Sequence, residues 1–272
     1  MNRLFSAVVL SLGLSLVGCS TPEPEYVDIV EEPIKVLYDR ALLSMSEGKY
    51  GQASEQFQEL EIQHPYSEWA MRAALMSGYV LYLKLDYDGA ILAFDRYVEL
   101  NPDSKDRPYA EYMAAVSYFE QIVDIGRDQF LTEQAAERFL RLIEQFPNSE
   151  YARDARVKYD LTQDQLAGKH MEVGRFYQKR NVHTGAINRF RQVIQGYGTT
   201  SHIPEALFRL AESQLFLGLR EDAQMAAAVL GYNYPNSSWY TKAYDLLVHN
   251  QLTPKAKSDG WLNTVYNIFE TN

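Results

Sequence analysis

Cys19 is the residue whose type and place most clearly indicate chemistry. It is the only cysteine of the 272-residue chain, and it ends the segment Leu16-Val17-Gly18-Cys19. A basic residue, Arg3, and an apolar run from Leu4 to Val17 come before it, and this run is too short to span a membrane. Small residues followed by a thiol suit cleavage before the thiol and acylation of its sulfur. The sequence therefore predicts a signal peptide over residues 1–18 and a lipid anchor on Cys19.

The residues around Cys19 resemble the lipobox of bacterial lipoproteins. That resemblance implies a covalent diacylglycerol on the sulfur and a further acyl chain, such as palmitate, on the new N-terminal amine. Several acyl chains on one residue hold a protein to a bilayer stably, where one chain does not. Ser20 stands where lipoproteins kept in the inner membrane have Asp. We therefore expect an outer-membrane protein that faces the periplasm.

The remaining polar residues indicate no reaction. The formal net charge is −10 and no dense Lys/Arg block is present, which argues against nucleic-acid binding. The five histidines have no metal-ligand spacing, and the Gly-x-Ser-x-Gly, Gly-x-x-x-x-Gly-Lys and His-Glu-x-x-His motifs are missing. A peptidoglycan-cleaving enzyme would need a separate catalytic domain, for which too few residues remain. We expect no catalytic residue, no metal and no cofactor beyond the lipid.

A short acidic segment follows the predicted anchor. Residues 20–33 contain three prolines, five acidic residues and no basic residue. Such a segment cannot bury enough apolar surface to fold alone. Residues 19–33 are therefore predicted to form a lipidated tether with a reach of roughly 45 Å.

From Ile34 onward the chain repeats a pair of helices. An Ala-x-x-x-Phe step recurs, with a Pro or Gly eight residues after its second member and, in most copies, a small residue twelve positions before its alanine. The steps are Ala53/Phe57, Ala90/Phe94, Ala135/Phe139, Ala186/Phe190 and the weaker Ala223/Ala227. This pattern resembles the tetratricopeptide repeat. The predicted fold is all-α, a right-handed superhelical solenoid of five tetratricopeptide-like helix pairs, with residues 237–250 as a C-terminal cap.

Two insertions interrupt the basic period of 37 residues. Phe94 and Phe139 are 45 residues apart, and the eight extra residues fall between Ala115 and Ala135 as a loop around 124–128. Phe139 and Phe190 are 51 residues apart, and the fourteen extra residues lengthen the first helix of repeat four. Because fourteen residues make nearly four turns, one helix is predicted over residues 149–180, with a bend near Gly168.

The first helices of repeats one to three carry a candidate groove for peptides. In tetratricopeptide arrays these helices line the concave face. Projection from the small residue of each repeat places Leu42, Met45, Leu75 and Val116 on that face, together with the following predicted site residues: Lys35, Tyr38, Arg72, Tyr79, Tyr82, Tyr109, Tyr112 and Phe119. Tyrosine offers a large apolar face and a hydroxyl that stays in contact with water, which suits recognition of extended peptides. The alternative is that these rings only pack between helices.

Repeat four and the tail suggest contacts with other proteins. Positive charge gathers there in an otherwise acidic chain, and the candidate partner-binding residues are Arg175, Arg180, Asn188, Arg189 and Arg191. A solvated basic face is an equal alternative. After Pro254, the residues Trp261, Leu262, Val265, Ile268 and Phe269 lie on one side of a possible helix capped by Asp259. That helix either covers the last repeat or docks elsewhere.

Residues 16–250 together resemble the BamD family, the lipoproteins of the outer-membrane β-barrel assembly machine. The likeness rests on Tyr50-Gly51-Gln52-Ala53, Phe94 to Pro102, Phe146 to Ala152 and Asn188-Arg189. It implies a scaffold that performs no chemistry and binds the POTRA domains of BamA, accessory Bam lipoproteins and unfolded outer-membrane proteins. Residues 34–147 would then receive substrates, residues 148–250 would dock partners, with Arg189 facing BamA, and residues 251–272 would form a tail. The alternative is another periplasmic tetratricopeptide protein that acts in cell division or envelope maintenance.

Overall fold

The structure is a computed structural model that describes residues 32–256 and 261–262. The chain divides into two units, Met1–Glu32 and Pro33–Asn272, and every described helix belongs to the second. The predicted signal peptide, the lipid anchor Cys19 and residues 19–31 of the tether lie outside the described residues. So do Asp259, Val265, Ile268 and Phe269 of the tail.

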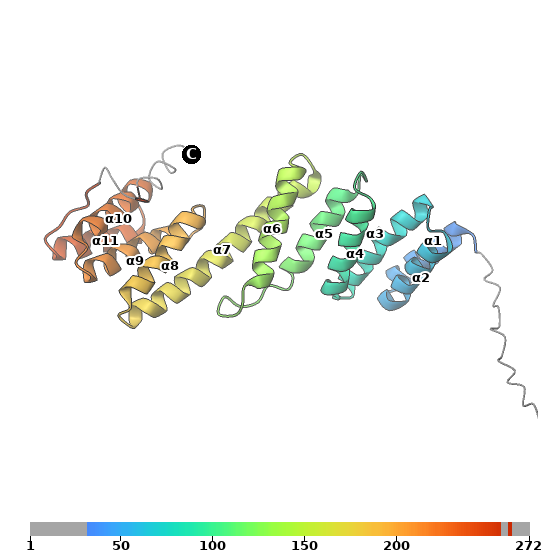
Figure 1. Ribbon diagram of the computed structural model, residues 1–272, viewed down its shortest axis with the longest axis horizontal. Coiled ribbons are helices and arrows are strands. Elements are labelled where there is room, and N and C mark those ends of the chain that lie inside the picture. The colour runs from blue at the N-terminus through green and yellow to red at the C-terminus, as the bar shows by residue number, and fades with distance from the viewer. Residues whose placement is uncertain (1–31, 257–260, 263–272) are drawn as a thin grey trace, which may run out of the picture. The chain divides into compact units, whose positions relative to one another are not determined.

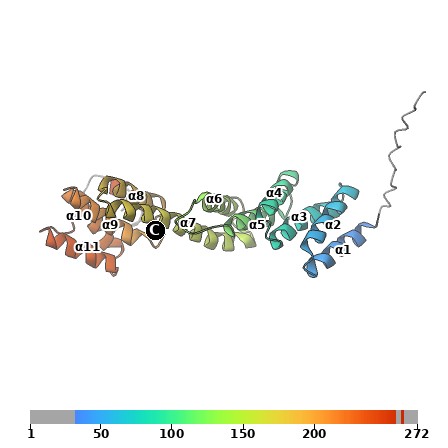
Figure 2. The same ribbon diagram turned by 90° about the horizontal axis from the view of Figure 1, so that it is seen from below.

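The described residues form eleven helices and no strand, so the all-α prediction is confirmed. The helices are α1 Ile34–Ser46, α2 Tyr50–Gln63, α3 Glu68–Leu83, α4 Tyr87–Leu100, α5 Arg107–Phe119, α6 Phe130–Gln145, α7 Glu150–Lys179, α8 His183–Gly196, α9 Ile203–Phe216, α10 Arg220–Asn233 and α11 Ser238–His249. Each helix packs against the next, and each odd-numbered helix also contacts the next odd-numbered one (Figures 1 and 2). This is the contact pattern of a tetratricopeptide-like solenoid, in which the odd-numbered helices up to α9 are the first helices of the repeats.

Tight turns join the two helices of most pairs. Each such turn places one residue in the left-handed region: Gly48, Leu85, Asn181 and Gly218. The next residue then donates its backbone N–H to a carbonyl five residues earlier, as from Lys49 to Ser44 at 2.9 Å. This Schellman geometry satisfies the free carbonyls at the end of the first helix and reverses the chain.

Serine caps start the helices α3, α7 and α11. Ser67, Ser149 and Ser237 each follow a proline by two residues, and each side-chain oxygen accepts a hydrogen bond from a backbone N–H in the first turn of the next helix. These bonds satisfy donors that the helix cannot satisfy itself. A Pro-x-Ser sequence therefore ends one pair and begins the next.

The repeated alanine and phenylalanine residues form the core between paired helices. Phe57, Phe94, Phe139 and Phe190 are all completely buried. The small residue of the preceding helix faces the ring: a Cβ added at Gly174 would lie 2.5 Å from Cε1 of Phe190. The small residue therefore leaves room for the ring to approach the preceding helix.

The two insertions meet in the structure. The eight-residue insertion forms the loop 120–129 between α5 and α6, and it lies on the lengthened helix α7. Lys169 donates to the carbonyl of Gly126 at 2.9 Å, and Gln165 donates to the carbonyl of Val123 at 3.0 Å. Gly168 faces Ile125, whose Cδ1 would lie 2.3 Å from an added Cβ. The glycine therefore gives the loop room to approach a helix that runs unbroken from Glu150 to Lys179.

Helix α11 follows the fifth pair at the predicted place. It buries Ala243 and Leu247 and packs against α9 and α10. In the described part of the chain, no helix is long and apolar enough to cross a membrane.

Candidate polypeptide-binding surface

Five tyrosines from three first helices lie together. We call Tyr79 and Tyr82 of α3, Tyr109 and Tyr112 of α5 and Tyr151 of α7 the tyrosine cluster. The rings of Tyr79 and Tyr82 stack at 6.4 Å between centroids, and Tyr151 lies 5.5 Å from Tyr109 and 5.4 Å from Tyr112. Each ring is half-buried, so one part supports the helix packing and another part meets solvent. The contacts between the odd-numbered helices bring these residues together.

The tyrosine cluster carries neutral phenols beside carboxylates. Burial raises the pKa of Tyr109 and of Tyr112 well above the ordinary value of 10.0. The hydroxyl of Tyr112 donates to Oδ2 of Asp154 at 2.5 Å, and this bond lowers the pKa of Asp154. The hydroxyl of Tyr82 lies 3.4 Å from Oε1 of Glu120, a longer contact. The surface is therefore aromatic, with negative charge at its edge and with two of its hydroxyls already bonded to carboxylates.

A second aromatic group lies on α1 and α3. Tyr38 packs edge to face against Trp69 at 5.0 Å and against Phe57 at 5.6 Å. The guanidinium of Arg72 lies over the Trp69 ring at 5.3 Å, a cation–π contact. Lys35 is exposed, and its ammonium lies 3.5 Å from Oδ2 of Asp39.

The structure thus brings together only part of the predicted groove. Tyr79, Tyr82, Tyr109 and Tyr112 join one cluster, whereas Tyr38 and Arg72 lie in the α1–α3 group. Phe119 packs on Phe139 of its own repeat at 6.0 Å. Leu42, Met45 and Leu75 are half-buried against the core. The expectation for Val116 was wrong, because its side chain is only 4% exposed and packs in the core with Phe139.

An aromatic position that was not predicted recurs near the start of α3, α7 and the capping helix α11. Trp69, Tyr151 and Trp239 each stand two residues after a capping serine. Each ring packs on an aromatic residue of the preceding first helix: Trp69 on Tyr38, Tyr151 on Tyr112, and Trp239 on Phe208 at 5.4 Å. The sequence does contain a signal for this position, because an aromatic residue stands two positions after the serine of each of these Pro-x-Ser turns. The groove residues were instead chosen by their spacing from the small residue of each first helix, and that spacing does not reach this position.

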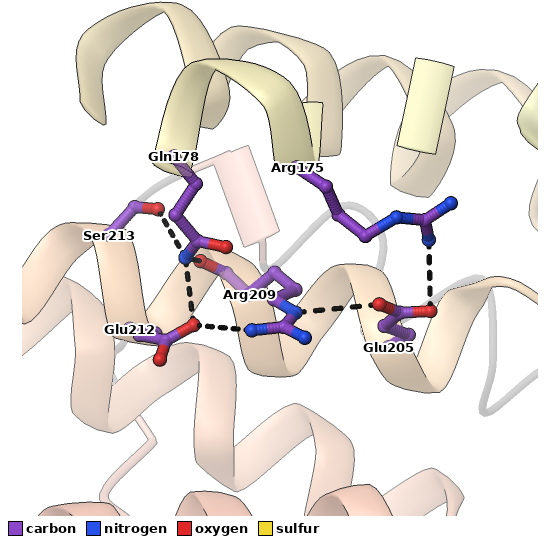
Figure 3. A network of polar contacts seen from close by, with 6 residues as sticks. All are labelled: Arg175, Gln178, Glu205, Arg209, Glu212 and Ser213. Carbon is purple, nitrogen blue, oxygen red and sulfur yellow. Dashed lines mark hydrogen bonds and ion pairs between the residues drawn. The ribbon is translucent and has the colours of Figure 1, made fainter. Parts of the chain in front are cut away.

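Arg175 belongs to a polar network between α7 and α9. Its Nη1 lies 3.2 Å from Oε2 of Glu205, and Arg209 bridges Glu205 and Glu212 (Figure 3). Gln178 donates to Glu212 at 2.8 Å and lies 3.1 Å from the hydroxyl of Ser213. The network holds two first helices together, so the charge of Arg175 is matched within the chain.

The other candidate partner-binding residues lie in separate places. Arg180, at the end of α7, lies 4.5 Å above the ring of Phe176. Asn188 is exposed on α8. Arg189 lies 3.2 Å from Oε1 of Gln192 and 3.4 Å from Nδ1 of His170. Arg191 covers the ring of Trp261 at 4.8 Å. The basic residues of repeat four are therefore divided among several local contacts.

Burial and the neighbouring Arg189 lower the pKa of His170 below its ordinary value. His170 therefore stays neutral at pH values where a free histidine is partly charged, which favours its contact with the cationic Arg189.

Within residues 32–256 and 261–262, no group of three or more His, Cys, Asp or Glu side chains is placed to hold a metal ion.

Comparison with known proteins places the chain in a family. Residues 30–230 match the family described as "YfiO: Outer membrane lipoprotein". A protein of Caulobacter vibrioides named "Outer membrane protein assembly factor BamD" is 46% identical over 241 residues, which cover 88% of this chain and 79% of the relative. The protein of that name from Rickettsia prowazekii is 42% identical over 251 residues, covering 92% and 99%. One from Neisseria meningitidis is 29% identical over 250 residues, covering 87% and 94%. With these relatives aligned over most of both lengths, the chain belongs to the BamD family of outer membrane lipoproteins.

Proposed function

We propose that this protein is a scaffold in the assembly of outer-membrane proteins, and that it holds other polypeptides without catalysing a reaction. The observation that carries this proposal is the tyrosine cluster on the first helices of a chain whose relatives are named assembly factors. Half-buried aromatic rings that are already fixed by packing lose little entropy when a peptide covers them. The hydroxyls of Tyr82 and Tyr112 already donate to Glu120 and Asp154, but the hydroxyl oxygens of the cluster can accept hydrogen bonds from the backbone N–H groups of an extended chain.

The proposed position is the periplasmic face of the outer membrane, with the lipid on Cys19 as the anchor. The support is the lipobox-like sequence before Cys19 and the family to which the chain belongs. An acidic tether would keep the helical repeats clear of the lipid surface, because its charges repel one another and its prolines favour extended backbone.

The proposed partners follow from the family resemblance. They are the POTRA domains of BamA, accessory Bam lipoproteins and unfolded outer-membrane proteins. The tyrosine cluster is the proposed site for the unfolded chains. Arg189 is the proposed contact to BamA, because this residue is half-buried and, among the described residues, neutral groups are its hydrogen-bonding partners. A carboxylate of a partner would give it a charged acceptor.

Substitution of two cluster tyrosines tests the proposed substrate site. We expect Tyr82→Ala with Tyr112→Ala to weaken binding of peptides from the C-terminal end of barrel proteins by about tenfold or more, since each lost aromatic contact costs about 1 kcal/mol. Fluorescence anisotropy with a labelled peptide measures the affinity, and circular dichroism checks that helicity is kept. Tyr66→Ala is the matched control, because Tyr66 is fully exposed in the turn before α3. Equal affinity of the double variant and the control would show that the cluster rings are only structural.

Substitution of Arg189 and a depletion experiment test the rest of the proposal. Arg189→Glu should lower co-purification of a POTRA-bearing barrel protein from mild-detergent extracts by about tenfold. Arg127→Glu is the control, since Arg127 is exposed on the loop 120–129. Depletion of the protein should lower the amounts of barrel proteins in the outer membrane. Normal barrel levels after depletion would contradict the assembly role, and unchanged co-purification would remove Arg189 from the interface.

A further inference from the structure

The chain after α11 turns back and follows α10. Gln251 adopts the left-handed conformation, and the N–H of Leu252 bonds to the carbonyl of Leu247 at 2.9 Å. Arg220, at the start of α10, donates to the carbonyl of Asn250 at 2.8 Å. One turn further along α10, Gln224 donates to the carbonyl of Thr253 at 2.7 Å and accepts from the N–H of Lys255 at 3.3 Å. Residues 250–255 are therefore fixed to α10 by hydrogen bonds at both their ends.

Trp261 and Leu262 make the next described contacts, and these reach α8. Leu262 is only 3% exposed and belongs to the apolar cluster formed by α7 to α11 and the tail itself. The ring of Trp261 lies 4.8 Å from the guanidinium of Arg191 on α8. Both residues are helical.

The contacts advance in one direction. Arg191 and Ala228 are equivalent in the two repeats, because they are 37 residues apart. The described tail residues therefore contact α10 at residue 220 and then at residue 224, and then contact α8 at the position equivalent to residue 228. These contacts advance toward the C-terminal ends of the two helices. Arg191 of α8 and Gln224 of α10 lie on the side of these helices that contacts the tail. We call this side the second-helix surface.

The sequence beyond Leu262 continues the same apolar face. Val265, Tyr266 and Phe269 follow Leu262 at i+3, i+4 and i+7, the spacing of one side of a helix. If that helix continues, the buried Leu262 fixes which side faces the protein. Ten residues remain after Leu262, which as a helix reach about 15 Å. That length is sufficient to pass the ends of α8 and α10.

We propose that residues 263–272 bind the second-helix surface of repeats four and five, as a helix that buries Val265, Tyr266 and Phe269 beside Leu262. The occupant of this surface is then the chain's own C-terminal end. Its attachment ties α8 to α10, so that the last two repeats move as one body. Another protein can reach this surface only after the tail has left it, and the tail thereby limits where partners dock on the C-terminal half.

Hydrogen exchange on the full-length protein tests this proposal. Phe269→Asp places a charge on the side that Leu262 faces, whereas Asn267→Asp places the same charge on the opposite side. Exchange of the α8 and α10 amides should accelerate by about tenfold or more in the first variant and stay within about twofold of the parent protein in the second. The amides of α1 to α4 serve as the internal reference, because those helices make no contact with α8 or α10 among the described residues.

A chain that ends at Leu262 provides the second measurement. It keeps the observed anchor and lacks only the proposed occupant, and its α8 and α10 amides should exchange as fast as those of Phe269→Asp. Rates unchanged from the parent protein, or equal acceleration by Phe269→Asp and Asn267→Asp, would overturn the proposal. Acceleration confined to a Leu262→Asp variant would also overturn it, because the docking would then end at the anchor.

Discussion

The substitution Gly174→Ala probes the close approach that defines each helix pair. The added Cβ would lie 2.5 Å from Cε1 and 2.9 Å from Cζ of Phe190, closer than real Cβ contacts. The ring of Phe190 is completely buried and cannot retreat into solvent. Overpacking of this kind costs about 1–3 kcal/mol, whereas alanine gains up to about 1 kcal/mol over glycine in a helix. The net expected loss of stability is about 1–2 kcal/mol.

Thermal unfolding followed by circular dichroism measures this effect. For a chain of this size, 1 kcal/mol corresponds to about 2–4 °C in Tm, so Gly174→Ala should lower Tm by about 2–8 °C. Gly51→Ala is the matched control: Gly51 is also helical, but an added Cβ there would meet no described atom within 4 Å. The control should raise Tm by about 2 °C. If Gly174→Ala raised Tm as the control does, the small residue would not be needed for helix packing and the reasoning would fail.

Three further predictions concern the turns, the ion pairs and the tyrosine cluster. Leu85→Gly should stabilise the protein by about 1 kcal/mol in urea unfolding, because Leu85 is 69% exposed and adopts the left-handed conformation that glycine enters without strain. Arg138→Lys should destabilise it by about 1 kcal/mol, since lysine cannot keep both 2.7 Å hydrogen bonds to Asp95, and an unchanged midpoint would contradict this. Tyr112→Phe should lower Tm at pH 7, because it removes the hydrogen bond that lowers the pKa of Asp154. The stability that this hydrogen bond gives to the ionised Asp154 is fully present above the unfolded pKa of about 3.9, and it is lost as the pH falls through the lower pKa of the folded state. A Tm difference between the variant and the parent protein that stays constant down to pH 2 would contradict the role given to this bond.

Much of the fold could be predicted because it repeats. The 37-residue period, the Ala-x-x-x-Phe step and the small residue of the first helix each report one packing contact made several times. A repeated contact gives a repeated signal, and the two departures from the period located the loop 120–129 and the long helix α7. Gly168, near which the sequence predicted a bend, lies where Ile125 of the inserted loop approaches α7, and an added Cβ would leave no room for that side chain.

The candidate site was harder to predict because it depends on contacts between repeats. Projection along one helix selected Tyr79, Tyr82, Tyr109 and Tyr112, but it could not place Tyr151, which approaches them from α7. The same projection cannot tell a residue turned to solvent from one turned into the next helix pair, and so it assigned the buried Val116 to the surface.

The contacts of the charged residues were also hard to predict from the sequence. Arg175 and Arg191 are close in sequence, yet one pairs with α9 and the other covers Trp261 of the tail. A local count of charge cannot reveal such partners, because they come from segments that are distant in the chain.

Site-specific photo-crosslinking in living cells tests the central claim most directly. A benzophenone side chain in place of Tyr79 would report which proteins touch the tyrosine cluster. The control is the same group in place of Leu92, which is 71% exposed on α4, the second helix of repeat two. The account predicts crosslinks from position 79 to newly made outer-membrane proteins and far fewer from position 92. Equal crosslinking at both positions, or crosslinks from position 79 only to proteins that are not destined for the outer membrane, would contradict it.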